Sequence, residues 1–269
     1  MHACESEVLA WYERQPRALT RSFVNSIPWT EIKKFPLPSR FTPVLLYMRD
    51  VEAFTDIYYK ELRLTPTGRD PVIRKFMDRW HHEEAQHADL LHRFLGEAGV
   101  PTEQNWYERT KSKIPRFYKI SSFLSSSLAN FVGKHFSAVH MVWGAINELT
   151  TYQGYRQLWQ AAKHPVLELI LRAIASEERI HIFFYRSIAR LKLQRSPFAQ
   201  KIARFIIEKF WSPVGEGTKP KKESDYVIST LFSGLEGIKI AHDKINDPIA
   251  RLPGFENCQK ITKRIAQAA

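Results

Sequence analysis

The amino-acid sequence predicts an all-α protein whose centre is a bundle of four long helices. Four long segments carry apolar residues at three- and four-residue steps, which is the spacing of one helix face. No run alternates apolar and polar residues as a strand would, and no low-complexity tract interrupts the pattern. Long amphipathic helices in succession bury their apolar faces against one another, so a bundle is the expected architecture.

An irregular arm is predicted at the N-terminus, and the first long helix follows it. We expect residues 1–40 to form an irregular N-terminal arm, because Pro16, Pro28, Pro36 and Pro38 interrupt them. The first long helix is predicted in PVLLYMRDVEAFTDIYYKEL, residues 43–62, and it ends at the turn-forming residues TPTGRDP. Its common face contains Leu45, Met48, Glu52, Tyr59 and Leu62.

Three further long helices are predicted before residue 196. The second covers residues 71–95, the third follows a basic connector and a short helix at residues 117–131, and the fourth begins near His164 and Pro165. The face of the second contains Ile73, Phe76, Trp80, Glu84, His87, Leu91 and Phe94. The face of the third contains Met141, Ala145, Glu148, Tyr152, Tyr155 and Trp159, and that of the fourth contains Ile170, Ile174, Glu178, His181, Tyr185 and Ile188.

The C-terminal third is predicted to add shorter helices to this bundle. They lie in KIARFIIEKFW, in DYVISTLFSGLEGIKIAHDKI and near the C-terminus, with SPVGEGTKPKKES between the first two. We therefore expect an N-terminal arm over residues 1–40, a four-helix bundle over residues 41–195 and a helical extension packed on it over residues 196–269.

Composition narrows the class of protein and its partners. With 269 residues, 44% of them hydrophobic, the chain can bury a large core. Cys4 and Cys258 are too few for a disulfide framework or a thiolate metal site, and neither a secretion signal nor a transmembrane segment is recognisable, so we expect a cytoplasmic protein. The net charge of +12 favours an acidic partner such as a carrier protein, nucleic acid or an anionic membrane surface. The basic segments at residues 108–119 and 190–205 are either solvated helix faces or a docking patch for that partner.

Two motifs with the same spacing suggest a metal site. WHHEEAQH, residues 80–87, contains Glu84-x-x-His87, and ASEERIH, residues 175–181, contains Glu178-x-x-His181. A glutamate on the inward face of the preceding helix accompanies each motif, Glu52 before the first and Glu148 before the second. A single Glu-x-x-His match carries little information, but two matches at corresponding positions of a repeated helix pair predict one shared site.

These residue types suit a pair of metal ions. Glutamate and histidine three positions apart project to the same side of a helix, so each motif can hold one ion while a glutamate from another helix completes or bridges the site. Four carboxylates balance two divalent cations, which offsets the cost of burying them. Oxygen-rich ligands with one imidazole per ion suit iron, with manganese as the alternative.

Neighbouring residues have two interpretations each. Glu83 and Glu177 lie either on solvated helix faces or behind the ligands, where a carboxylate holds the outer nitrogen of a histidine; we expect Glu177 near His87. The aromatic residues Phe76, Trp80, Tyr152, Tyr155 and Tyr185 are mainly core residues, with electron transfer or a radical role as the alternative. His135, His140, His164 and His242 are expected to be core or exposed residues without a metal.

The same segments resemble a known family. WHHEEAQHADLLHRFLGEAG resembles the second helix of the soluble acyl-carrier-protein desaturases, including Trp80 four residues before Glu84. INELTTY resembles the family's third helix, with Thr151 three residues after Glu148, and ASEERIHIFFYRSI is similar to its fourth, with Tyr185 four residues after His181. The resemblance covers about residues 40–195 and implies a ferritin-like di-iron carboxylate fold.

The resemblance implies a function as well as a fold. It implies that two iron ions, or manganese in place of one or both, are bound by Glu52, Glu84, His87, Glu148, Glu178 and His181, with Trp80, Thr151 and Tyr185 as neighbours. It implies an O2-dependent desaturase that takes a fatty-acyl chain on an acyl-carrier protein and electrons from a ferredoxin-like donor. The chain departs from the family pattern at Tyr155, where other members often carry histidine, and in its C-terminal third.

Other functions are compatible with the same cluster. Hydroxylation or N-oxygenation of another small molecule keeps the metal site and changes the substrate. Iron storage, or a metal-stabilised binding protein without turnover, belongs to a different class. A ribonucleotide-reductase radical subunit would carry tyrosine where Leu91 stands, and a rubrerythrin-type peroxidase would carry paired Cys-x-x-Cys motifs. Nucleic-acid binding rests on charge alone and is not expected, and a homodimer remains open.

Overall fold

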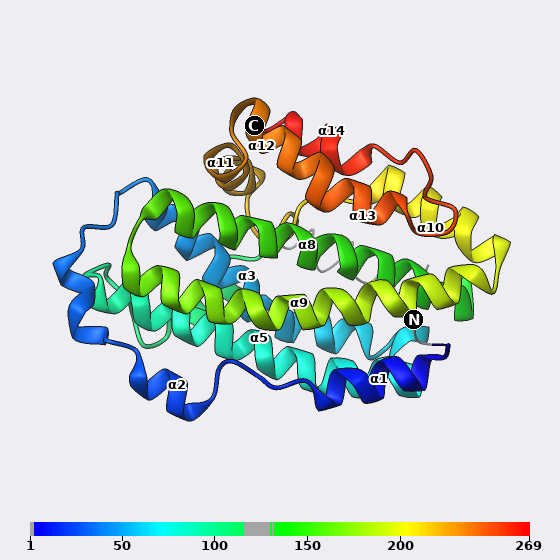
Figure 1. The fold of residues 1–269 in the computed structure, drawn as a ribbon, viewed down its shortest axis with the longest axis horizontal. Helices are drawn as coiled ribbons and strands as arrows, with labels where there is room; N and C mark the ends of the chain where they lie inside the picture. Colours follow the sequence, from blue (N-terminus) through cyan, green and yellow to red (C-terminus); the bar gives the residue numbers. More distant parts are fainter. Residues whose placement is uncertain (1–2, 116–129, 131) are drawn as a thin grey trace.

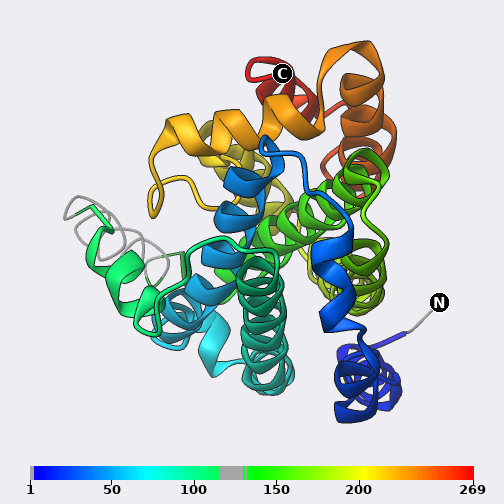
Figure 2. The same ribbon diagram turned by 90° about the vertical axis from the view of Figure 1, so that its left-hand side faces the viewer.

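The protein is built from α-helices. The computed structural model describes residues 3–115, 130 and 132–269, and no strand occurs among these residues, so the predicted all-α helical bundle is confirmed. Figures 1 and 2 show the long helices side by side, with the shorter C-terminal helices over one face of the bundle. None of the helices in the described part of the chain has the length and apolar content that a bilayer crossing requires.

Four long helices form the bundle as two hairpins. The first hairpin pairs α3 (Phe41–Leu62) with α5 (Pro71–Glu97), and the second pairs α8 (Phe136–Ala162) with α9 (Pro165–Gln194). The short helix α4 (Pro66–Arg69) lies in the first connection, and α6 (Trp106–Ser112) and the 3-10 turn η2 (Gly133–His135) lie between the hairpins. The short helix predicted at residues 117–131 falls almost entirely outside the described residues.

Local sequence signals explain where these helices begin and end. The side chain of Asp70 accepts hydrogen bonds from the backbone N–H groups of Val72 and Ile73, and proline follows it at the first helical position of α5. Lys163 has φ +50°, a left-handed conformation that ends α8. His164 then caps α9 by accepting the N–H of Leu167 at 3.2 Å. The predicted start of this helix is therefore confirmed.

The expectation of an irregular N-terminal arm is wrong. Residues 1–40 contain α1 (Glu5–Arg14), α2 (Arg21–Ser26) and the 3-10 helix η1 (Trp29–Lys34). The prolines lie between or beside these helices, so they limit helix length without preventing helix formation. Val8, Leu9 and Tyr12 share the buried face of α1, which packs on α5 and α9.

The C-terminal helices pack on the bundle, as expected. They are α10 (Pro197–Phe210), α11 (Lys221–Leu231), α12 (Gly234–Ile240), the π-helical turn η3 (Ala241–Asn246), α13 (Asp247–Ala250) and α14 (Lys260–Ala266). Helix α10 packs on α8 and α9, α11 packs on α3, and η3 packs on α8. The segment predicted as one helix from Asp225 breaks before α12, where Gly234 has φ +66°. The division into three regions at residues 40 and 195 stays a prediction.

Candidate metal centre

Six side chains from the four long helices meet in the interior of the bundle. They are Glu52 of α3, Glu84 and His87 of α5, Glu148 of α8, and Glu178 and His181 of α9, and all are buried. Their donor atoms form two groups in which every atom lies within 4.8 Å of the others. One group contains Glu52, Glu84, His87 and Glu178, and the other contains Glu84, Glu148, Glu178 and His181.

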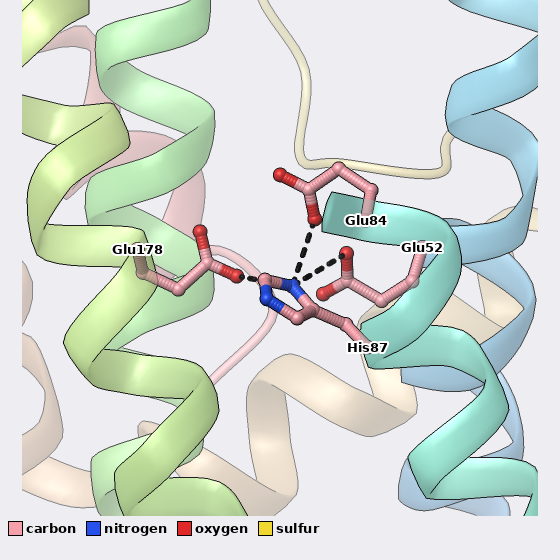
Figure 3. A group of neighbouring side chains, drawn as sticks. All are labelled: Glu52, Glu84, His87 and Glu178. Atoms are coloured by element: carbon pink, nitrogen blue, oxygen red, sulfur yellow. Dashed lines mark hydrogen bonds and ion pairs between the residues drawn. The ribbon is translucent and has the colours of Figure 1, made fainter. Parts of the chain in front are cut away.

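The first group surrounds Nδ1 of His87 with carboxylate oxygens (Figure 3). This nitrogen lies 3.0 Å from Oε2 of Glu84, 3.3 Å from Oε1 of Glu178 and 3.9 Å from Oε2 of Glu52. The side chains enter from three helices and point toward a common centre. Four donors of this kind are able to hold one cation.

The second group repeats this arrangement around His181. Its Nδ1 lies 3.1 Å from Oε1 of Glu84, 3.3 Å from Oε2 of Glu178 and 4.0 Å from Oε2 of Glu148. Glu84 and Glu178 therefore give one oxygen to each group, whereas Glu52 and Glu148 each belong to one group only. Glu84 and Glu178 would therefore contribute to holding both ions, whereas the terminal carboxylates, Glu52 and Glu148, would each contribute to holding one.

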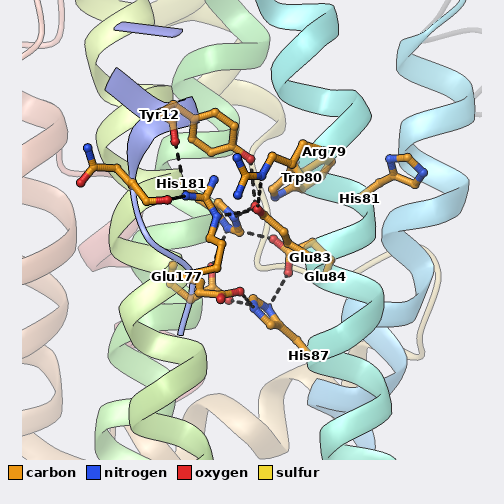
Figure 4. Close-up of polar contacts among 12 residues, drawn as sticks. Tyr12, Arg79, Trp80, His81, Glu83, Glu84, His87, Glu177 and His181 are labelled. Carbon is orange, nitrogen blue, oxygen red and sulfur yellow. Dashed lines mark hydrogen bonds and ion pairs between the residues drawn. The ribbon is translucent and has the colours of Figure 1, made fainter. Parts of the chain in front are cut away.

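The outer nitrogens of both histidines face carboxylates (Figure 4). Nε2 of His87 lies 3.3 Å from Oε2 of Glu177, and Nε2 of His181 lies 2.8 Å from Oε2 of Glu83. Because a carboxylate accepts hydrogen bonds, it favours the tautomer that carries the proton on Nε2. The lone pair of Nδ1 is then directed into the cluster, as a metal-ligating histidine requires.

Each outer carboxylate is itself held in place. Glu83 accepts hydrogen bonds from the hydroxyl of Tyr12 at 2.8 Å, from Nε of Arg17 at 2.5 Å and from Nε of Arg79 at 2.7 Å. Glu177 accepts the backbone N–H of Leu19 at 2.9 Å. The pKa of Glu83 is lowered overall although burial raises it, because His181 and Arg17 favour the charged form. Glu83 therefore keeps its negative charge beside the outer nitrogen of His181.

The terminal carboxylates are oriented by aromatic side chains. The hydroxyl of Tyr155 donates a hydrogen bond to Oε1 of Glu52, and the indole N–H of Trp80 donates to Oε1 of Glu148 at 3.0 Å. In both cases the second oxygen of the carboxylate faces a histidine Nδ1. Each terminal glutamate is thus held with one oxygen toward the centre of the cluster.

The electrostatics of the cluster favour a positive charge at its centre. Burial and repulsion from Glu84 raise the pKa of Glu52 to about 8, and burial together with Glu178 and Glu84 raises the pKa of Glu148 well above its usual value. Burial lowers the pKa of His87 and His181, but the surrounding carboxylates raise it well above its usual value overall. Metal cations would supply this positive charge and leave both imidazoles neutral.

Two buried carboxylate oxygens of the cluster indicate whether its residues fit a metal. Oε1 of Glu84 and Oε1 of Glu178 are buried, and neither takes part in a hydrogen bond of normal geometry with the residues that the structure describes. Each nevertheless lies within 3.3 Å of a histidine Nδ1. When the proton of each histidine is on Nε2, Nδ1 is also an acceptor, and acceptor atoms that converge in this way are costly in a protein interior unless a cation lies between them. The donor set therefore fits a pair of cations.

Thr151 and Tyr185 lie farther from the centre of the cluster. Thr151 borders a cavity of about 60 Å³ between α3, α8 and α11. Glu52 also lines this cavity, and the other lining side chains are mostly apolar. Tyr185 is buried, and its ring centroid lies 6.0 Å from that of Trp80 and 5.8 Å from that of His140. Thr151 therefore shares a cavity with Glu52, and Tyr185 lies beside Trp80, whose indole donates to Glu148.

Sequence reasoning missed the contribution of the N-terminal helix. Tyr12, Arg17 and Leu19 contact residues more than 60 positions away, and no local pattern indicates such pairing. The inward spacing from Glu148 to Tyr155 was visible, but it did not show that the hydroxyl of Tyr155 meets Glu52. Of the four histidines set aside, His164 is hydrogen-bonded in the core, His140 is buried and His242 is exposed.

Fold and site together define a helical-bundle protein with a buried carboxylate and histidine cluster that can hold metal ions. The chain belongs to the fatty acid desaturase family, because the model of that family matches residues 63–209, more than half of its length. The match contains five of the six cluster residues, and Glu52 lies before it. No curated protein and no solved structure matches the chain.

Proposed function

We propose that the cluster binds two iron ions and that the protein is an O2-dependent di-iron oxidoreductase. The observation that carries this proposal is the pair of four-residue donor groups that share Glu84 and Glu178. Manganese, alone or with iron, suits the same ligands, because carboxylate oxygens with one imidazole per ion match both metals. The carboxylates that face the outer nitrogens of His87 and His181 support metal binding through the inner nitrogens.

The proposed reaction is desaturation of a fatty-acyl chain, carried on an acyl-carrier protein. Desaturation converts a CH2–CH2 pair into CH=CH, while O2, two electrons and two protons give two molecules of water. The two electrons would come from a ferredoxin-like donor. Reduced iron would supply O2 activation and the oxidising strength needed at an unactivated carbon. Membership of the fatty acid desaturase family supports the substrate class.

The chain itself would position the substrate and keep water from the cluster. The cavity beside Glu52 is lined by Met48, Val51, Leu231 and other mostly apolar residues, which suits an alkyl chain. Its volume of about 60 Å³ holds only a small part of such a chain. Binding would therefore require α11 or the segment before it to move outward from α3.

The proposed partners are an acidic carrier protein and an electron donor, and the proposed location is the cytoplasm. The charge of +12 suits an acidic carrier protein and an acidic electron donor. A cytoplasmic location is compatible with Cys4 and Cys258, which are free thiols.

Single-turnover chemistry on metal-loaded protein tests the proposal. Purified protein should contain about two ions per chain, as the two donor groups require. After reduction and exposure to O2, acyl-carrier substrates should yield an unsaturated product, identified by mass spectrometry. A hydroxylated or N-oxygenated product would instead show that the enzyme is an oxygenase and not a desaturase. Uptake of many ions per chain without product would identify iron storage, and two retained ions without any product would identify a metal-stabilised binding protein.

A further inference from the structure

Helix α10 has one face packed on the bundle and an opposite face directed to solvent. Ala199, Ala203 and Ile207 are buried against the long helices α8 and α9. These three residues are spaced four apart, so they lie on one side of the helix. The other side is not covered by any described part of the chain, and α10 lies at the outside of the molecule (Figure 1).

Three phenylalanines of α10 are largely exposed, two of them on its solvent side and the third, Phe210, at its C-terminal end. Phe198, Phe205 and Phe210 are 57%, 55% and 60% exposed, respectively. Phe198 and Phe205 are two turns apart on the same side, and the rings of Phe205 and Phe210 have centroids 6.3 Å apart. One exposed apolar side chain needs no explanation, but three large rings along one 14-residue helix mark an interaction surface.

Basic side chains lie among these rings. Lys201 and Lys209 are exposed on the same side of α10, and Lys134 is exposed in η2. His135, next to Lys134, has its ring centroid 5.1 Å from that of Phe198. Within the described residues, no ion pair neutralises these three lysines, whereas Glu208, the acidic residue on α10, is paired with Arg204 at 2.5 Å. The exposed face is therefore both aromatic and positively charged.

We propose that this aromatic and basic face of α10 docks on the surface of an anionic lipid bilayer. A helix lying in the interface places its aromatic rings among the acyl chains and its lysines at the phosphate groups. The phenylalanines supply the apolar contact, and the unpaired lysines supply the charge complementarity. The surface is separate from the metal centre, so this proposal goes beyond the proposed oxidoreductase and is independent of it.

Vesicle sedimentation tests this proposal directly. The full-length protein is mixed with vesicles of phosphatidylcholine alone, or of phosphatidylcholine and phosphatidylglycerol in equal parts. We expect partitioning at least about tenfold stronger on the anionic vesicles than on the neutral ones, and weaker partitioning at high salt. The triple variant Phe198→Ser/Phe205→Ser/Phe210→Ser should partition onto anionic vesicles at least about tenfold more weakly than the wild type. In Lys201→Gln/Lys209→Gln, partitioning should fall about fivefold for each lysine replaced.

Matched variants test whether binding is specific to this face of α10 or is produced by any exposed apolar or basic side chains. Leu64→Ser/Leu235→Ser removes two apolar side chains that are 72% and 88% exposed elsewhere, and Lys75→Gln/Lys222→Gln removes the same charge elsewhere. Both variants should bind vesicles as the wild type does. Equal loss in the matched variants, or no preference for anionic vesicles, would overturn the proposal. So would a solution dimer that the triple phenylalanine variant converts to monomer, because a second copy would then cover this face.

The membrane-docking proposal and the proposed enzyme function can each be refuted without the other. Binding should be equal for chelated and metal-loaded wild-type protein, because α10 contributes no side chain to the cluster. Circular dichroism should show unchanged helix content in the phenylalanine variant, since its three substituted side chains are largely exposed.

Discussion

The shared carboxylates predict that two substitutions of the same kind have different effects on metal binding. Glu84 gives an oxygen to both donor groups, whereas Glu52 belongs to one. Glu84→Ala reduces both groups from four donor residues to three. Glu52→Ala leaves the group of Glu84, Glu148, Glu178 and His181 complete. We therefore expect Glu84→Ala to weaken both metal-binding steps and Glu52→Ala to weaken only one.

The expected size of the effect follows from these donor counts. Loss of a supporting residue behind a metal ligand typically costs 10- to 100-fold in affinity, and loss of a ligand should cost at least about as much. At a metal concentration that loads the wild type with about two ions per chain, Glu52→Ala should retain about one and Glu84→Ala close to none. The exposed Glu236→Ala variant should keep the wild-type ratio.

Anaerobic titration with ferrous iron, followed by elemental analysis of the desalted protein, measures this ratio. Circular dichroism and size exclusion should first show that each variant is folded. Equal loss of metal in Glu52→Ala and Glu84→Ala would refute the assignment of shared and terminal carboxylates. Retention of two tightly held ions in Glu84→Ala would refute the cluster as the metal site.

Three further predictions concern residues around the cluster. Tyr155→Phe removes the hydrogen bond to Glu52 and should lower the affinity for one of the two ions about 10- to 100-fold, measured by metal titration. Burial lowers the pKa of His140 to about 3, so the unfolded chain binds a proton more readily than the folded protein does. The free energy of unfolding therefore falls as pH drops below about 6.5. Between pH 7 and pH 5 the wild type should lose about 2 kcal/mol more of this free energy than His140→Leu, measured by urea denaturation. Gly144→Ala would place a methyl group 2.1 Å from the ring of Tyr185 and should destabilise the protein by about 1–3 kcal/mol in the same assay.

Each of these predictions has a matched control. Tyr152→Phe, on a half-buried tyrosine in the same helix, should leave metal affinity unchanged. His242→Leu, at an exposed histidine, should not change the dependence of stability on pH, and equal curves for the wild type and His140→Leu would contradict the burial argument. Gly154→Ala should cost less than Gly144→Ala, because its nearest neighbour, 3.1 Å away, is the flexible end of Met48.

Local patterns in the sequence determined the helices and the residues that face inward. Glu84 and His87, like Glu178 and His181, lie on one side of a helix because a helix turns once in 3.6 residues. That geometry depends only on near neighbours in the chain, so spacing alone predicted that these four side chains enter the core. It left Glu83 and Glu177 undecided, and both are buried. The irregular arm was predicted wrongly because the prolines were taken as breaking the segment, whereas the apolar spacing of Val8, Leu9 and Tyr12 already allowed a helix between them.

Only the tertiary structure decided how these side chains meet. The sharing of Glu84 and Glu178, the contact of Tyr155 with Glu52 and the approach of Tyr12 to Glu83 depend on the relative positions of different helices. Those positions result from the packing of the whole core, in which residues far apart in sequence contribute together. The sequence therefore indicates which residues are available to the site, whereas packing determines their partners.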